Sequence, residues 1–103
     1  MAKKTRFAVI GTGGRSRMFW QALGEDPRIK RHNELVALLE PNRTRADYVN
    51  SQLGAELPIY QPHQFERMIK REKLDAVVVT TRDNLHDLYI VKGLEAGLKV
   101  VTE

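Results

Sequence analysis

The sequence predicts an α/β fold with a doubly wound parallel sheet, in which five strands take the order 3-2-1-4-5 and helices flank both faces. Two observations lead to this fold class. Apolar, β-branched segments alternate along the chain with segments that repeat apolar residues at helical spacing, and such alternation gives parallel strands joined by right-handed crossovers. In addition, the first apolar segment runs directly into a glycine-rich loop, GTGGRS.

The first half of the chain contains two strands and two helices. Residues 6–10 (RFAVI) predict a buried strand that ends at Gly11. From Gly14 onward, apolar residues at helical spacing predict a helix that ends at Gly24 and Asp26-Pro27. The polar stretch at 28–33 predicts a loop, and residues 34–40 (ELVALLE) predict the second strand. A helix follows with Ala46, Val49 and Leu53 on one face, and Gly54 ends it.

The second half repeats this alternation. Residues 57–60 (LPIY) predict an edge strand, because Pro58 cannot donate to a sheet ladder. Phe65, Met68 and Ile69 mark the third helix. The unbroken apolar run at 75–80 (DAVVVT) predicts a strand that is buried on both faces. We expect Asn84 to cap a fourth helix, with Asp87 completing a capping box. Gly97 ends that helix, and residues 99–102 (KVVT) form the fifth strand.

Composition narrows the class of protein. A chain of 103 residues is long enough for one domain, 1–103, with a single core. Its net charge of +4 comes from scattered basic residues, without the dense basic and aromatic stripe of a nucleic-acid binder. No apolar run approaches the roughly 20 residues of a membrane span. The chain has no cysteine and no signal peptide pattern, which makes a cytoplasmic setting the default. We expect neither nucleic-acid nor membrane binding.

The glycine-rich loop predicts a dinucleotide site. Gly11, Gly13 and Ser16 occupy the three positions of the pattern G-x-G-x-x-G between a strand and a helix. Gly11 permits the tight turn, Gly13 lets a pyrophosphate approach the backbone, and the small Ser16 allows close packing of helix and strand. The helix N-terminus then offers free amides to the phosphates. The predicted contacts of this Rossmann-type loop are Gly11, Thr12, Gly13, Gly14, Arg15 and Ser16.

An acidic residue at the end of the second strand supports the same site. Glu40 lies 24 positions after Ser16, where a carboxylate can accept hydrogen bonds from both hydroxyls of the adenosine ribose. The alternative is a solvated strand end. The carboxylate predicts NAD over NADP, although Arg43 and Arg45 just downstream could pair with a 2′-phosphate. Arg15 and Arg17 are candidates for phosphate contact or for plain surface exposure, and Trp20 is expected in the core or in a subunit contact.

Four segments together resemble one known family. AVIGTGGRSRM, LVALLEPNRTRA, DAVVVTT and NLHDLYIVKGLEAGLKVVTE are similar to the N-terminal domain of the Gfo/Idh/MocA oxidoreductases. The most specific part is the tail, where an N-x-H pattern precedes a helix and a strand that runs into a Glu. The resemblance covers nearly the whole chain. It implies a nicotinamide dinucleotide cofactor and, in a longer protein, a sugar- or polyol-like substrate.

The resemblance also assigns individual residues. It implies that Thr80 and Thr81 line the cofactor groove, that Asn84 and His86 form the N-x-H pattern, and that Glu103 is the Glu of the family's Glu-Lys-Pro motif. Asp83 departs from the family, since many members carry Pro there. No catalytic residue is assigned, because the Lys of the motif would lie beyond Glu103. His32, His63 and His86 show no metal-ligand spacing, so we expect no metal.

The chain ends on a strand, which predicts a fragment whose substrate domain is absent. As a fragment, it is expected to bind cofactor without turnover. The edge strand at 99–102 would then be open to pairing with another chain, giving a homo-oligomer, with apolar surface from Trp20 or Tyr89 contributing.

Two other functions fit parts of the pattern. One is a regulatory or sensing Rossmann module that binds a dinucleotide without chemistry. The other is a methyltransferase that uses S-adenosylmethionine, whose glycine-rich loop is also followed by an acid at the end of the second strand. The fifth strand ending in Glu does not support the methyltransferase. The fold alone does not decide between the remaining functions.

Overall fold

The predicted sheet is present in the computed structural model, which describes residues 3–102. All strand pairs are parallel, and the order is β3-β2-β1-β4-β5. The strands are β1 (Thr5–Ile10), β2 (Asn33–Leu39), β3 (Ile59–Tyr60), β4 (Ala76–Val79) and β5 (Lys99–Thr102). Both predictions, the α/β class and the strand order, are therefore confirmed. Glu103 lies outside the described residues.

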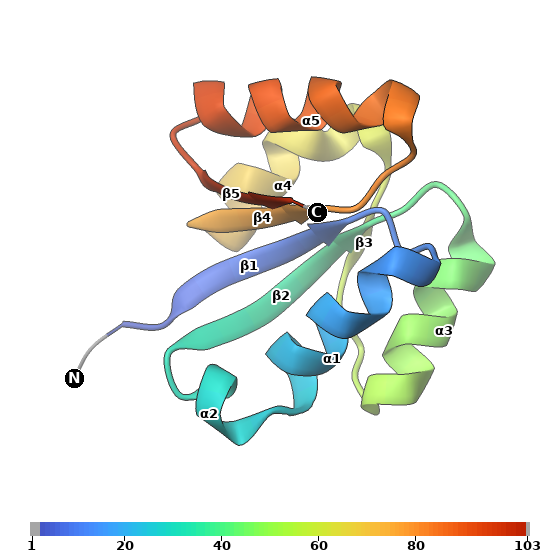
Figure 1. The fold of residues 1–103 in the computed structure, drawn as a ribbon, viewed down its shortest axis with the longest axis vertical. Coiled ribbons are helices and arrows are strands. Elements are labelled where there is room, and N and C mark those ends of the chain that lie inside the picture. Colours follow the sequence, from blue (N-terminus) through green and yellow to red (C-terminus); the bar gives the residue numbers. More distant parts are fainter. Residues whose placement is uncertain (1–2, 103) are drawn as a thin grey trace.

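Helices cover both faces of the sheet (Figure 1). On one side lie α1 (Arg17–Glu25) and α3 (Arg43–Leu53), and on the other lie α4 (Phe65–Glu72) and α5 (Asp83–Glu95). The shorter elements are α2 (Pro27–Lys30) and the 3-10 turns η1 (Gly14–Ser16) and η2 (Pro62–Gln64). This two-sided covering explains why β1 and β4 read as continuous apolar runs.

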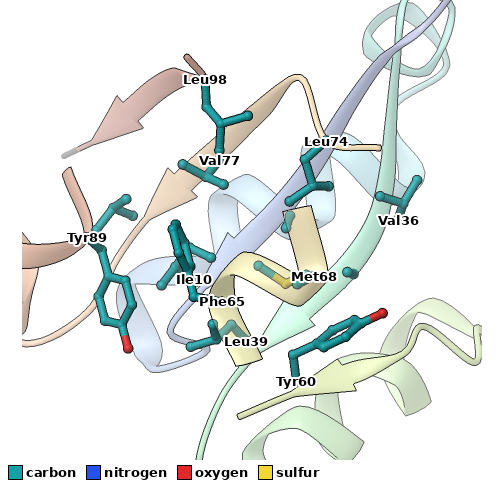
Figure 2. Close-up of a cluster of buried hydrophobic side chains, with 13 residues drawn as sticks. Ile10, Val36, Leu39, Tyr60, Phe65, Met68, Leu74, Val77, Tyr89 and Leu98 are labelled. Atoms are coloured by element: carbon teal, nitrogen blue, oxygen red, sulfur yellow. The ribbon is translucent and has the colours of Figure 1, made fainter. Parts of the chain in front are cut away.

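Each face of the sheet has its own apolar cluster. Phe65, Met68 and Tyr89 pack beneath α4 and α5 against Ile10 and Leu39 of the sheet (Figure 2). The opposite cluster joins Trp20 and Leu23 of α1 to Val49 of α3 and to Val9 and Leu38 of the sheet. All four residues of β4 are buried, as their sequence predicts. The core thus fixes the positions of the carboxyl ends of β1, β2 and β4 relative to one another.

A β-bulge interrupts the ladder between β1 and β2. The partners shift between Phe7, which lies opposite Leu35, and Ala8, which lies opposite Ala37. As a result Val36 and Ala37 both contribute to the cluster beneath α4 and α5, although neighbouring residues of a regular strand face opposite sides. Beyond the bulge the register is regular up to Ile10 and Leu39.

Some local expectations are corrected. Residues 27–30 form a helical turn where a loop was expected, because the Asp26 side chain accepts a hydrogen bond from the Arg28 amide and Pro27 fits a first helical position. This contact lowers the pKa of Asp26. The first helix runs past Gly24 and ends at Glu25, directly before Asp26-Pro27, the second of its two predicted end signals. Asn84 lies inside α5, whose N-cap is Arg82, so the predicted asparagine cap is wrong.

The predicted helix ends and the predicted positions of two aromatic side chains can be compared with the structure. Gly54 and Gly97 follow their helices with positive φ angles of 62° and 79°, in agreement with their predicted role as helix stops. Trp20 is buried, as expected for a core residue. Tyr89 is buried as well, so neither aromatic residue supplies the exposed association surface that we expected from them. Both rings complete the packing between a helix and the sheet.

Candidate functional site

The turn after β1 is shaped by close contact with the end of β4. Gly11 has a φ of +88°, which L side chains rarely adopt. A Cβ built on Gly11 would lie 3.0 Å from Thr81 Cγ2 and 3.1 Å from the Thr80 carbonyl oxygen. The Gly11 amide donates to the Leu39 carbonyl at 2.8 Å. Glycine is therefore required here by both backbone conformation and space.

The rest of the loop leaves open space above its backbone. A Cβ on Gly13 or Gly14 would meet no atom within 4 Å. Ser16 is fully buried and donates its hydroxyl hydrogen bond to the Gly13 carbonyl oxygen at 2.6 Å, which fixes the turn from below. The loop then enters α1 at Arg17. An anion can thus approach the backbone at Gly13 and meet the amino-terminal end of a helix.

Glu40 is buried immediately beyond β2 and is bound to the glycine loop. Its Oε1 accepts from the Thr12 amide at 2.7 Å and from the Thr12 hydroxyl at 2.9 Å. Its Oε2 accepts from the Asn42 amide at 2.9 Å. Because a carboxylate oxygen accepts about two hydrogen bonds, Oε2 keeps capacity for one more donor. The carboxylate therefore supports the loop as well as facing the cavity.

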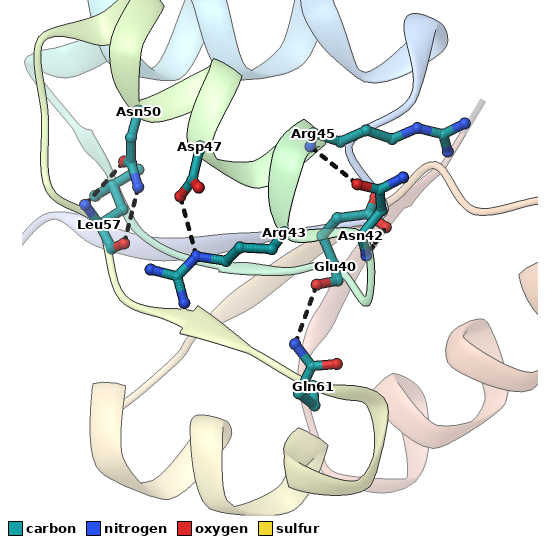
Figure 3. Close-up of polar contacts among 8 residues, drawn as sticks. All are labelled: Glu40, Asn42, Arg43, Arg45, Asp47, Asn50, Leu57 and Gln61. Carbon is teal, nitrogen blue, oxygen red and sulfur yellow. Dashed lines mark hydrogen bonds and ion pairs between the residues drawn. The ribbon is translucent and has the colours of Figure 1, made fainter.

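The two arginines after Glu40 extend in opposite directions (Figure 3). Arg43 Nε binds Asp47 Oδ1 at 3.0 Å on the exposed side of α3, away from the cavity. The Arg45 side chain instead lines the cavity, while its amide donates to the capping Asn42 side chain at 3.3 Å. The structure thus brings Arg45 to the glycine loop but not Arg43, although the sequence made both candidates for contact with a 2′-phosphate.

The residues after β4 form the opposite wall. The Thr80 hydroxyl donates to the Gly11 carbonyl oxygen at 2.8 Å, which ties the end of β4 to the glycine loop. Within the described residues, Thr81 Oγ1 is a buried side-chain oxygen without a hydrogen-bond partner. Buried hydroxyls normally have partners, so this oxygen marks a position where a ligand can bind.

These walls enclose a cavity of about 500 Å³ beyond the carboxyl ends of the strands. Five of the predicted residues line it: Gly11, Gly13, Glu40, Thr80 and Thr81. Sequence reasoning missed Pro41, Pro62, Arg82, Leu85 and Tyr89. Each of the two prolines lies two residues after the end of a strand, a position that could have identified it. Burial raises the pKa of the Tyr89 phenol above its ordinary value.

A second cavity of about 280 Å³ lies on the other side of Gly13, between α1 and α3. Thr12, Gly14 and Arg45 contribute to it, together with Arg17, Trp20 and Tyr48. The Arg17 guanidinium carbon lies 5.9 Å from the centre of the Trp20 ring, within range of a cation–π contact. Arg15 is exposed and lines neither of the two cavities.

Of the two N-x-H residues, His86 contacts the end of β5. His86 Nε2 is 3.2 Å from the Val79 carbonyl oxygen and 2.5 Å from Thr102 Oγ1, so it links the ends of β4 and β5. Asn84 is exposed on the first turn of α5 and does not line the cavity. Glu103, which the resemblance identifies as the Glu of the Glu-Lys-Pro motif, is outside the described residues. His86 thus lies at the carboxyl ends of β4 and β5, and neither it nor Asn84 lines the cavity.

Two properties of residues 3–102 bear on other functions. No group of three or more His, Cys, Asp or Glu side chains in that range is arranged to hold a metal ion. None of the helices there has both the length and the apolar character needed to cross a bilayer.

Comparison with known proteins identifies the class of this site. The sequence profile of the Gfo/Idh/MocA family, described as an oxidoreductase family with an NAD-binding Rossmann fold, matches residues 5–103. YteT of Bacillus subtilis is 33% identical over 88 residues, which are 84% of this chain and 20% of that protein. An inositol 2-dehydrogenase/D-chiro-inositol 3-dehydrogenase of Halalkalibacterium halodurans is 29% identical over an aligned region that spans 95% of this chain and 27% of that protein.

A solved structure shares this arrangement. The WlbA dehydrogenase of Bordetella pertussis, in complex with NADH and UDP-GlcNAcA, is 25% identical with a TM-score of 0.77 and covers 97% of this chain. The match takes up 28% of the WlbA chain, and the chain spans 20–27% of the two curated relatives named above. The family match extends over nearly all of the sequence and includes the glycine loop, Glu40 and the Thr80–Thr81 wall. The chain belongs to the Gfo/Idh/MocA oxidoreductase family, of which it carries the NAD-binding Rossmann domain.

Proposed function

We propose that the cavity between β1, β2 and β4 binds a nicotinamide dinucleotide for an oxidoreductase that acts on a sugar- or polyol-like substrate. The observation that carries the proposal is the cradle at the glycine loop, where Gly13 leaves the backbone open and the Thr81 hydroxyl has no partner among the described residues. These features fit a dinucleotide. When bound, the nicotinamide would supply the hydride acceptor or donor.

The proposed contacts follow from the walls of the cavity. The backbone of Gly11–Ser16 would hold the pyrophosphate, and the free capacity of Glu40 Oε2 would accept from an adenosine ribose hydroxyl. Thr81 Oγ1 would bind the cofactor from the β4 side. A carboxylate near the ribose favours NAD over NADP, while Arg45 opposes that preference because it lines both cavities beside Gly13.

The substrate class and the lack of turnover are proposed from the relatives. Two of them are named for acting on inositol or for binding UDP-GlcNAcA, and each is more than three times the length that this chain covers. We therefore propose that residues 1–103 bind the cofactor, that catalysis requires further residues, and that the open edge of β5 can pair with a strand of another copy. Sugar or polyol oxidation by the purified chain would contradict the second of these statements.

The binding proposal is tested with Gly13→Val. The valine methyl groups would occupy the space that the pyrophosphate needs, while the folded chain has room for them. We expect NAD affinity to fall at least about tenfold, or about 1.4 kcal/mol, with the thermal unfolding transition retained. Calorimetric titration with NAD, NADH, NADP and S-adenosylmethionine measures this. Unchanged NAD affinity in the folded variant would contradict the proposed binding site. Preferential binding of S-adenosylmethionine would show that the proposed cofactor is wrong.

Thr81→Val tests the opposite wall of the same cavity. The substitution keeps the shape of the side chain and removes a hydroxyl that has no partner in the described chain. We expect the free energy of unfolding to stay constant or to rise by up to about 1 kcal/mol, while NAD affinity falls about two- to tenfold. Thr80→Val is the matched control, because its hydroxyl binds Gly11 and its loss should reduce stability. Equal NAD affinity of wild type and Thr81→Val would exclude the hydroxyl from the site.

A further inference from the structure

Tyr89 carries a hydroxyl group that the fold leaves without a hydrogen-bond partner. The side chain is 4% exposed and packs its ring against Phe65, with the two ring centres 5.5 Å apart. Among residues 3–102 no group pairs with the phenol oxygen. Burial alone raises the pKa of this phenol, whereas burial and a hydrogen bond to Glu72 together raise the pKa of the Tyr60 phenol. Buried hydroxyls normally have partners, so the Tyr89 hydroxyl indicates a contact that the apolar core does not supply.

This hydroxyl belongs to the inner part of the cofactor cavity. Leu85 and Tyr89 both line the cavity and are four residues apart, which places them on one face of α5 about 6 Å apart along the helix. Leu85 is 39% exposed at the rim, whereas Tyr89 is one turn further in and 4% exposed. Figure 2 shows the Tyr89 hydroxyl at the far end of its ring, directed out of the apolar cluster. Tyr89 thus brings a polar group to the inner end of an apolar wall.

The surroundings of this hydroxyl fit the base of a dinucleotide. Leu39, Pro41 and Pro62 line the same cavity and add apolar surface to that of Leu85. Small-molecule sites typically combine such surface with a few placed polar groups. The free capacity of Glu40 Oε2, which would accept from the adenosine ribose, lies in this cavity as well. A ribose bound there directs the attached adenine, which is planar and has apolar faces, between the apolar walls, with its polar edge toward the inner end.

We propose that the Tyr89 hydroxyl forms a hydrogen bond with the edge of the adenine base, which makes Tyr89 a residue that selects the base of the cofactor. This inference rests on the proposed function, because it takes the cavity as a dinucleotide site. A phenol can both donate and accept, and the edge of adenine presents a nitrogen that accepts and an amino group that donates. A pyrimidine extends less far from its ribose than a purine does. A dinucleotide with cytosine in place of adenine therefore leaves the phenol unpaired and binds more weakly.

Tyr89→Phe tests the contact, because it removes the hydroxyl and keeps the ring against Phe65. Calorimetric titration of wild type and variant with NAD and with nicotinamide cytosine dinucleotide compares two ligands that differ only in the base. We expect the NAD affinity of the variant to fall about three- to tenfold, while its affinity for the cytosine analogue stays within about twofold of wild type. The midpoint of chemical denaturation without ligand should stay constant or rise, since no hydrogen bond within residues 3–102 is lost.

Tyr60→Phe is the matched control. It removes a hydroxyl from the same apolar cluster, but this hydroxyl donates to Glu72 Oε2 at 2.5 Å, and Tyr60 does not line the cavity. We expect the denaturation midpoint of this variant to fall. The ratio of its affinities for NAD and for the cytosine analogue should equal that of wild type.

The outcomes separate the base contact from the proposed function. If wild type binds NAD and Tyr89→Phe binds it equally well, the base contact is overturned and the dinucleotide site remains. If the variant loses the same factor in affinity for both dinucleotides, Tyr89 supports the cavity without selecting the base, which also overturns the inference. If wild type binds neither dinucleotide, the proposed function is wrong, and the base contact is wrong with it.

Discussion

Replacing Gly11 with alanine is expected to lower the free energy of unfolding by about 2–5 kcal/mol and to remove cofactor binding. A left-handed conformation costs a residue with a Cβ about 1–2 kcal/mol, and Gly11 has a φ of +88°. The new methyl group would also lie 3.0–3.1 Å from atoms of Thr80 and Thr81, and overpacking costs about 1–3 kcal/mol. Any relaxation moves the Thr81 wall, so binding is lost along with stability.

Gly13→Ala is the matched control for this change. It adds the same methyl group two residues away, at a φ of −71° and with no atom within 4 Å. We expect its unfolding free energy to stay within about 0.5 kcal/mol of wild type. Chemical denaturation of both variants measures the difference. If the two alanine variants were equally stable, the contact between Gly11 and the end of β4 would not constrain the loop.

Replacing Glu40 with alanine is the second change with a large expected effect. The carboxylate is buried and accepts from the Thr12 amide, the Thr12 hydroxyl and the Asn42 amide. Its loss leaves three donors without their acceptor, and each unsatisfied buried group costs about 1–3 kcal/mol. Water can enter from the adjoining cavity and replace part of these contacts, so we expect a loss of about 2–4 kcal/mol. Denaturation monitored by circular dichroism measures it.

Glu40→Gln separates the charge from the hydrogen bonds. The amide oxygen can still accept from both donors of Thr12, but the amide nitrogen would face the Asn42 N–H as a second donor. We expect a stability between wild type and Glu40→Ala. Without the negative charge, affinity for NADP should rise relative to NAD. If wild type bound NADP as tightly as NAD, the carboxylate would not select the cofactor. If Glu40→Ala were fully stable, it would not support the loop.

The sequence was most informative where burial and backbone geometry leave few choices. The apolar run that became β4 was predicted as a strand covered on both faces, and the alternation of strands with helices led to the parallel, doubly wound sheet. Gly11 was correctly predicted as the turn residue, because few other residues tolerate its conformation. The position of Glu40 followed from its place at the end of the second strand, whereas those of Thr80 and Thr81 were implied by the family resemblance.

The directions in which the polar side chains point could not be predicted from the sequence. Arg43 and Arg45 are the same residue type in the same helical turn, so the sequence does not distinguish them. In the structure Arg43 binds Asp47, whereas Arg45 lines the cavity. The hydrogen bonds from Thr12 to Glu40 depend on the exact register of β1 and β2, which residue types alone do not specify. The helical turn after Asp26 was missed because the Asp-Pro pair was interpreted as the end of one helix and not also as the start of the next.

The bulge in β2 has a consequence for how this domain can vary between relatives. Val36 is the additional residue at the bulge, and it shifts the alternation of side chains between the two faces of the sheet by one position. Removing that residue would restore regular alternation and leave Glu40 opposite the glycine loop, whereas removing a residue after Ala37 would turn the carboxylate to the other face. Length changes in this strand can therefore be absorbed before the bulge, while the segment from Ala37 to Glu40 must keep its length for the site to persist.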